Sequence, residues 1–186
     1  MKTIFFHSTI IYIPYCPQIE QMRNINYAEK KIFDLSSLKR EIEGWRLKSK
    51  TIAFTNGVFD IVHKGHIASL SQAAAEADCL IVAINSDRSV KRLKGENRPI
   101  YPEQVRAMML ASLLITDAIV IFEEDTPLHV INTLLPDVLV KGGDYTLEQI
   151  VGAKEVTANG GRVVINPIIE GFSTTKIIEN LEMLKQ

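Results

Sequence analysis

The sequence is poor in cysteine, carries almost no net charge and has no apolar run long enough to cross a membrane. Its two cysteines, Cys16 and Cys79, lie far apart, which excludes a disulfide framework and a cysteine-rich metal site. A formal net charge of −1 provides no basic field for nucleic acid or an anionic membrane. Repeats and low-complexity tracts are also missing, while 46% of the residues are hydrophobic. We therefore expect one compact domain with a sizeable core.

Residues 1–21 differ from the rest of the chain. They begin with one lysine and an apolar stretch, as a signal peptide does, but His7 and Pro14 interrupt that stretch and no small-residue cleavage site follows. Met22 offers a second start. We interpret residues 1–21 as an N-terminal extension on a cytoplasmic protein. The sequence leaves open whether this extension belongs to the native protein. A helical lead-in over residues 22–50 and a main domain over residues 51–186 follow.

From residue 51 onwards, short apolar runs alternate with helical patterns. The runs that predict strands are 51–55, 79–85, 118–122, 137–141 and 162–166. The segments that predict helices are 65–77, 87–93, 103–115, 127–135, 147–159 and 174–184. This alternation predicts a single α/β domain, a Rossmann-like doubly wound parallel sheet of about five strands with helices on both faces.

Local signals support several of these boundaries. Residues 30–50 have the pattern of an amphipathic helix that leads into the first strand. Thr126 before Pro127 predicts an N-cap with proline at the first helical position. Thr146 and Gln149 have the spacing of a capping box.

The stretch TNGVFDIVHKGH, residues 55–66, follows the first predicted strand and carries the clearest chemical signal. Ligands of open parallel sheets bind beyond the carboxyl ends of the strands. Asn56-Gly57 permits a sharp turn, and His63 and His66 bracket Gly65 at the start of a helix, where free N–H groups bind anions. The spacing of three lets both imidazoles face one point and predicts a phosphate site. Zinc is the alternative, but no third ligand has a convincing spacing.

The form G-x-F-D-x-x-H-x-G-H, residues 57–66, resembles the H-x-G-H element of the cytidylyltransferase-like nucleotidyltransferases. A second family element is expected near the C-terminus, and EGFSTTKII at 170–178 resembles it. The family often has a basic residue where Ile178 stands, so one phosphate contact is either absent or supplied by Lys176. Residues 91–110 and 122–156 are similar to the adenylyltransferases of ADP-heptose biosynthesis. The resemblance covers about residues 30–186.

The resemblance implies transfer of AMP from ATP to a sugar 1-phosphate, foremost D-glycero-D-manno-heptose 1-phosphate, giving ADP-heptose and pyrophosphate for lipopolysaccharide core synthesis. The implied catalytic residues are His63, His66 and Lys94. The implied nucleotide-binding residues are Thr55, Asn56, Gly57, Phe59, Gly65, Ser173, Thr174 and Thr175. The implied substrate-binding residues are Asp60, Arg98, Arg106, Gly142, Gly143 and Asp144. Mg²⁺ would accompany ATP without protein side-chain ligands.

The expected partners are therefore ATP and a sugar 1-phosphate, with no nucleic acid and no membrane. A homodimer and a separate upstream sugar kinase are also expected. The sequence does not reveal the base, the acceptor or its anomer. A cytidylyltransferase acting on glycerol 3-phosphate, a GDP-heptose route and a non-catalytic nucleotide sensor remain alternatives.

Several assigned residues have a structural alternative. Ser173, Thr174 and Thr175 have the pattern of a helix N-cap. Lys94 belongs to a charge run that is typical of a solvated face. Arg106 is equally compatible with a phosphate contact and with a structural role on its helix. The residues of KGGDY, 141–145, are compatible with a flexible turn.

Overall fold

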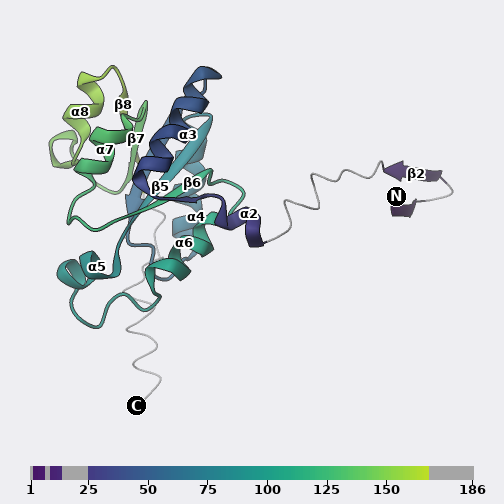
Figure 1. The fold of residues 1–186 in the computed structure, drawn as a ribbon, viewed down its shortest axis with the longest axis horizontal. Helices are drawn as coiled ribbons and strands as arrows, with labels where there is room; N and C mark the ends of the chain where they lie inside the picture. The colour runs from purple at the N-terminus through teal and green to yellow at the C-terminus, as the bar shows by residue number, and fades with distance from the viewer. Residues whose placement is uncertain (1, 7–8, 14–24, 168–186) are drawn as a thin grey trace, which may run out of the picture.

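The computed structural model describes residues 2–6, 9–13 and 25–167 (Figure 1). Its centre is a six-stranded sheet in which every neighbouring pair of strands is parallel. Across the sheet the strands are β3 (Ile32–Phe33), β6 (Ala118–Phe122), β5 (Cys79–Asn85), β4 (Ile52–Gly57), β7 (Val138–Gly142) and β8 (Arg162–Asn166). The predicted parallel α/β sheet is therefore confirmed, with one strand more than expected.

The strand order creates a switch point between β4 and β7. From β4 the chain builds β5 and β6 towards one edge, then returns to build β7 and β8 on the other side of β4. At such a point the connections leave the two strand ends in opposite directions and open a crevice beyond them. The segment after β4 therefore lies where a ligand is expected.

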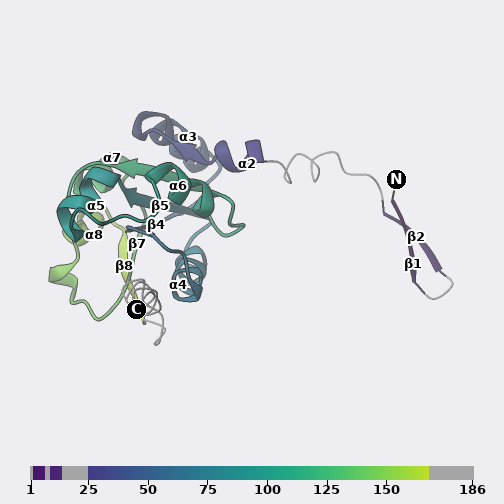
Figure 2. The ribbon, with the colours of Figure 1, turned by 90° about the horizontal axis from the view of Figure 1, so that it is seen from below.

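Helices cover both faces of the sheet, as the buried side chains show. One core joins the sheet to α3 (Leu35–Leu47), α7 (Leu128–Leu134) and α8 (Ala153–Ala158). The other core joins it to α2 (Ile25–Glu29), α4 (Lys64–Ala74) and α6 (Glu103–Ala111). Figure 2 shows α3 and α4 on opposite sides of the sheet. All residues of β5 are buried, which explains its unbroken apolar run.

Three local predictions need correction. The segment 30–50 is not one helix, because Ile32–Phe33 pairs with β6 before α3 begins at Leu35. The predicted helix 147–159 is interrupted and forms the 3₁₀ turn η1 (Leu147–Gln149) and then α8. Gly152 causes the break with a positive φ of 89°, and a Cβ there would lie 2.5 Å from Ile131 Cδ1.

The N-cap of α7 is Pro127 and not Thr126, so that prediction was wrong. The capping box is present, with the Gln149 side chain accepting from the Thr146 backbone N–H at 2.9 Å. The predicted helix at 174–184 lies outside the described residues.

Residues near the N-terminus form β1 (Lys2–Phe6) and β2 (Thr9–Ile13), an antiparallel pair with a sheet of its own. These two strands were not predicted, and the interpretation of residues 1–21 as an extension stays a prediction. None of the helices in the described part of the chain has the length and apolar character needed to span a bilayer.

Candidate active site

His63 and His66 lie together at the N-terminus of α4, beyond the carboxyl end of β4. His63 is the N-cap residue, and its ring Nδ1 accepts from the His66 backbone N–H at 3.4 Å. The two imidazole rings stack with their centroids 3.8 Å apart and their planes 20° from parallel. The spacing in the sequence therefore correctly predicted that both rings meet at one helix start. The capping role of His63 coexists with any ligand role.

Burial favours the neutral form of both imidazoles. Burial lowers the pKa of His66 to about 4, the neighbouring His63 lowers it further, and the Ile61 backbone opposes the shift. Burial also lowers the pKa of His63. A bound phosphate would add negative charge beside these rings and favour their protonated forms. The pair can therefore donate hydrogen bonds to phosphate oxygens.

The residues between β4 and the histidines shape this end of the strand. Phe59 is buried with a positive φ of 49°, and its ring centroid lies 5.2 Å from that of His66. A Cβ at Gly57 would come within 2.9 Å of the Phe59 ring, so only glycine fits there without a shift. Thr55 is buried in the sheet, and Gly65 lies in the first turn of α4. Phe59 thus supports His66 directly, while the nucleotide contacts assigned to these residues stay predictions.

Asp60 anchors the loop that precedes α6. The residue is 2% exposed, and its carboxylate accepts from Arg98 Nε at 2.7 Å. The backbone N–H groups of Ile100 and Tyr101 also donate to it, at 2.8 and 2.9 Å. Burial raises the pKa of Asp60, but these hydrogen bonds outweigh burial and the net pKa is lowered. Because the loop occupies both carboxylate oxygens, the geometry favours a positioning role over the predicted substrate contacts of Asp60 and Arg98.

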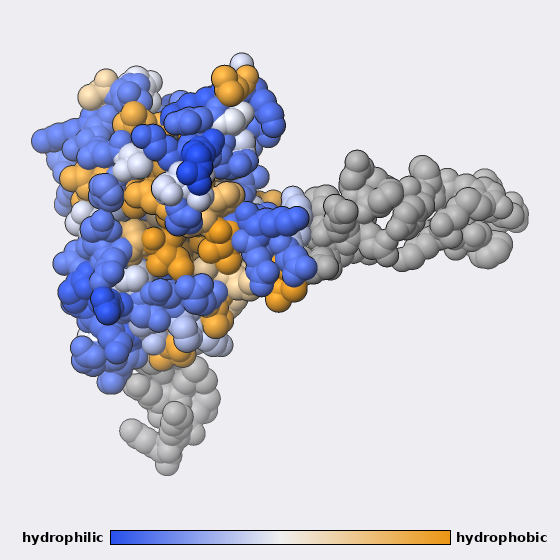
Figure 3. Space-filling view, in the orientation of Figure 1, coloured by the Kyte–Doolittle hydropathy of each residue, from blue (hydrophilic) through white to orange (hydrophobic). Residues whose placement is uncertain are grey.

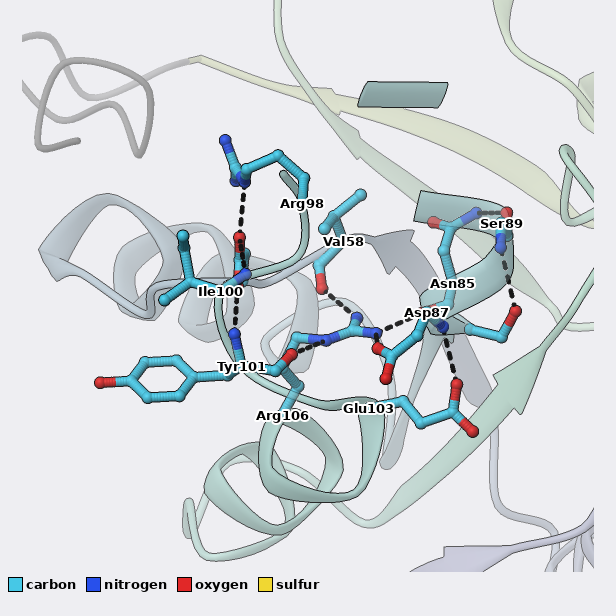
Figure 4. A network of polar contacts seen from close by, with 11 residues as sticks. Val58, Asn85, Asp87, Ser89, Arg98, Ile100, Tyr101, Glu103 and Arg106 are labelled. Atoms are coloured by element: carbon cyan, nitrogen blue, oxygen red, sulfur yellow. Dashed lines mark hydrogen bonds and ion pairs between the residues drawn. The ribbon is translucent and has the colours of Figure 1, made fainter. Parts of the chain in front are cut away.

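Arg106 lies at the centre of a second network (Figure 4). The side chain is fully buried, and its Nη2 donates to Asp87 Oδ1 at 2.8 Å. Three backbone carbonyls accept its remaining hydrogen bonds, those of Tyr101, Val58 and Asn85. These bonds join the end of β5, the loop after β4 and the start of α6. The structure therefore favours the structural alternative for Arg106 over the predicted phosphate contact.

The KGGDY segment begins with the last two residues of β7, and its Gly142 lies close to α4. A Cβ on Gly142 would lie 3.1 Å from Ser69 Oγ, which places the end of β7 against that helix. Gly143 has a positive φ of 136°, a conformation that favours glycine. Asp144 is exposed, and so is Lys94 at the end of α5 (Asp87–Lys94). The ligand roles of Lys94, Gly142, Gly143 and Asp144 stay predictions.

Lys141 was not among the site residues predicted from the sequence. Its Nζ donates to Asn56 Oδ1 at 3.0 Å, and burial lowers its pKa. Both residues line a pocket of about 230 Å³. The other lining residues are Asp125, Thr126, Pro127, Leu139, Tyr145, Gln149, Ile150 and Val151. The sequence contained one signal for such a role, because Lys141 is a charged residue that continues the buried apolar strand β7.

Within the described ranges, no three His, Cys, Asp or Glu side chains gather in a way that would hold a metal ion. The predicted phosphate contacts of Ser173, Thr174 and Thr175 lie outside those ranges. The described part of the site is thus built from two imidazoles, backbone N–H groups and a partly buried ammonium group.

Comparison with known proteins decides the family. The family model described as "Cytidylyltransferase-like" matches residues 54–180, which include the histidine pair and the C-terminal element. The chain belongs to the cytidylyltransferase-like family. The predicted family resemblance is thereby confirmed.

Individual relatives agree with this membership. The chain is 53% identical over 156 residues to the Bifunctional protein HldE of Koribacter versatilis, covering 84% of this chain and 32% of that protein. It is 53% identical over 153 residues to the protein of the same name from Nitrobacter winogradskyi, covering 82% of this chain and 31% of that protein. The chain thus spans about a third of the length of the curated relatives it matches.

A solved structure also matches the cytidylyltransferase-like chain. It is the lipopolysaccharide core biosynthesis protein from Thermoplasma volcanium GSS1, with 27% identity and a TM-score of 0.52. The match covers 64% of this chain and 97% of that one. The same arrangement of strands and helices therefore occurs in a protein of much lower sequence identity.

Proposed function

We propose that the protein is an adenylyltransferase that transfers AMP from ATP to D-glycero-D-manno-heptose 1-phosphate. The products are ADP-heptose, a precursor for the lipopolysaccharide core, and pyrophosphate. The observation that carries the proposal is the stacked His63–His66 pair at the α4 N-terminus, beyond β4 at the switch point. The similarity to the HldE proteins, which extends over more than four-fifths of this chain, supports heptose phosphate as the acceptor.

The reaction forms one bond and breaks one bond at the α-phosphorus. A phosphate oxygen of the sugar 1-phosphate attacks, and the bond to the bridging oxygen breaks so that pyrophosphate leaves with the electron pair. The attacking phosphate is already ionised at neutral pH, so no side chain has to remove a proton. Both reactants are anions, and charge stabilisation and in-line positioning therefore supply most of the catalysis.

The site residues serve these two needs. The rings of His63 and His66 donate to the phosphate oxygens and stabilise charge on the leaving pyrophosphate. The backbone N–H groups of the first turn of α4 add the field of the helix N-terminus. Lys94 is proposed to contact the transferring phosphates, and Ser173, Thr174 and Thr175 are proposed to bind the β- and γ-phosphates.

Mg²⁺ is proposed to enter with ATP, held by the triphosphate oxygens. When bound, it neutralises charge on the leaving phosphates. The use of ATP places the reaction in the cytoplasm. We further propose that a sugar kinase on a separate protein supplies the sugar 1-phosphate.

A homodimer is also part of the proposal. Tyr101, Val105 and Met109 are exposed large hydrophobics four residues apart, and the last two belong to α6. Residues at this spacing lie on one side of a helix. Figure 3 shows apolar surface beside α2 and α6, where a second copy would cover it. Sedimentation equilibrium measures this directly, since a monomer at micromolar concentration would contradict the proposal.

A triphosphate panel tests the function. ATP, CTP and GTP are each incubated with the α or β anomer of D-glycero-D-manno-heptose 1-phosphate, with glycerol 3-phosphate, or with no acceptor. We expect pyrophosphate release only with ATP and a heptose 1-phosphate, and a product with the mass of ADP-heptose. Turnover of CTP with glycerol 3-phosphate would indicate a cytidylyltransferase instead. ATP binding without pyrophosphate release under any condition would indicate a nucleotide sensor.

A further inference from the structure

The pocket that contains Asn56 and Lys141 lies across the tip of β4 from α4. Side chains alternate along a strand, and Ile52 and Phe54 belong to the core shared with α3, α7 and α8. Asn56 continues this row, whereas Ala53 belongs to the core shared with α4 and α6. The strand tip therefore separates the pocket from the helix that carries the histidine pair.

The lining of the pocket combines several kinds of polar group with apolar walls. It includes an ammonium group, a carboxamide, a carboxylate and a hydroxyl group, from Lys141, Asn56, Asp125 and Thr126. Leu139 and Ile150 are buried at its base. A rigid polyol with hydroxyl groups in several directions requires both donors and acceptors, while its C–H faces require apolar contact.

Tyr145 adds an aromatic wall. It lines the pocket and is 44% exposed. Its ring lies over Gly143, where a Cβ would come within 2.7 Å of Tyr145 Cε2. The backbone at Gly143 thus leaves room for a ring that can cover one face of a sugar.

Among the described residues, the ammonium group of Lys141 has fewer hydrogen-bond acceptors than it can use. Within the described part of the chain, its ammonium group donates only to Asn56, to Oδ1 at 3.0 Å and to the backbone oxygen at 3.5 Å. No carboxylate in that part lies within ion-pair distance of it. An ammonium group can donate three hydrogen bonds, and burying it against neutral acceptors alone is unfavourable. A hydroxyl or phosphate oxygen of a ligand would accept the remaining hydrogen bond of the Lys141 ammonium group.

The direction of the reaction relates this pocket to the acceptor. In a displacement at phosphorus, the attacking and leaving oxygens lie roughly in line on opposite sides of the phosphorus. The histidine pair and the α4 N-terminus hold the leaving pyrophosphate on one side of the β4 tip. The acceptor must then approach from the other side, where the pocket lies.

We propose that the pocket lined by Asn56, Lys141 and Tyr145 is the subsite that binds the sugar ring of the acceptor. This inference rests on the proposed function and adds the residues that recognise the acceptor. Lys141 and Asn56 bind ring hydroxyl groups, and Tyr145 covers one face of the ring. The nucleotide stays on the side of α4.

The test compares Lys141→Met with wild-type protein and with Lys154→Met, the same change at an exposed lysine of α8. Pyrophosphate release is measured with varied heptose 1-phosphate at saturating ATP, and then with varied ATP. We expect Lys141→Met to raise the KM for the sugar phosphate by about 10- to 100-fold, the range for losing a hydrogen bond to a charged group. The KM for ATP should stay within about threefold, and Lys154→Met should behave as wild type.

Two outcomes would overturn the inference. An unchanged KM for the sugar phosphate would show that Lys141 does not contact it. An equal loss of ATP affinity in calorimetry with ATP alone would assign the pocket to the nucleotide. If Lys141→Met lacks the wild-type thermal transition, Tyr145→Leu at the exposed rim replaces it, with the same expected rise in KM.

Failure of the proposed function gives a different result. In that case wild-type protein releases no pyrophosphate with any heptose 1-phosphate. Calorimetry with heptose 1-phosphate alone then tests the pocket directly. Binding by wild type that is lost in Lys141→Met would uphold the subsite, and equal binding by both proteins would refute it.

Discussion

Replacement of Arg106 by methionine separates the two roles that the sequence left open for this residue. The change keeps a long side chain in the buried space but removes every donor. The carbonyls of Tyr101, Val58 and Asn85 and the carboxylate of Asp87 then lose the partner they share. These groups belong to three different segments around the site, so we expect a large loss of stability.

The magnitude follows from burial. Removing one partner of a buried, hydrogen-bonded ion pair costs about 3–5 kcal/mol, because the groups that it leaves behind are buried without a partner. The Asp87 side chain is 35% exposed, so water replaces part of its lost interaction. We therefore expect a total near 3–5 kcal/mol, a large share of the roughly 5–15 kcal/mol that stabilises a typical domain.

Urea unfolding followed by circular dichroism measures this loss. With a slope of about 2 kcal/mol per molar urea, the midpoint should fall by roughly 1.5–2.5 M. Arg88→Met is the matched control, because Arg88 pairs with Glu123 in an exposed ion pair and should lose less than about 1 kcal/mol. An Arg106→Met protein that unfolds at the wild-type midpoint but no longer releases pyrophosphate would refute the structural role and indicate a direct phosphate contact.

Three further predictions concern the site. His63→Ala and His66→Ala should each lower turnover at saturating ATP by about 10²-fold or more, the scale for losing one charge-stabilising donor, and near-normal turnover would exclude the catalytic role. Asp144→Asn should lower kcat/KM by about 5- to 150-fold with an unchanged Tm if Asp144 accepts from a sugar or ribose hydroxyl. A lower Tm with unchanged kinetics would instead indicate a turn. Because the pKa of His66 falls from 6.5 to about 4 on folding, the unfolded chain takes up the proton first and stability should fall as the pH drops from 6.5 towards 4. The unfolding free energy, measured in urea at pH 6.5 and 4.5, should therefore depend less on pH in His66→Gln than in wild type. Because the ring is partly exposed, the two proteins should differ in this pH dependence by less than about 3 kcal/mol. The same pH dependence in both proteins would contradict the lowered pKa.

The sheet could be predicted because its strands are short, apolar and separated by helices. Residues buried on both faces of a parallel sheet leave an unbroken apolar run, as in Cys79–Asn85, and such a run is visible without any partner. Ile32–Phe33 has too few residues for a periodic pattern and is a strand only because β6 lies beside it. The break before α8 similarly depends on Gly152 meeting Ile131 of α7. Local patterns thus indicated the major strands, and contacts between elements decided the exceptions.

The histidine pair was accessible from the sequence for a local reason. His63 and His66 occupy the N-cap and the first turn of one helix, so their spacing alone brings the rings together. The charged groups around them were not accessible in this way. Asp60, Arg106 and Lys141 bind partners 38, 48 and 85 residues away.

The sequence by itself therefore determined the alternation of strands and helices and the turn after β4 that brings the two histidines together. Both depend on hydrophobic periodicity and on residues close together in the chain. Only the tertiary structure decided which cationic side chain lines a pocket and which joins segments of the scaffold. Arg106 is enclosed by carbonyls from three segments, whereas Lys141 emerges in a pocket beside Asn56. The physical reason is that a charged side chain takes its role from the groups that surround it, and the packing of the strand ends sets those groups.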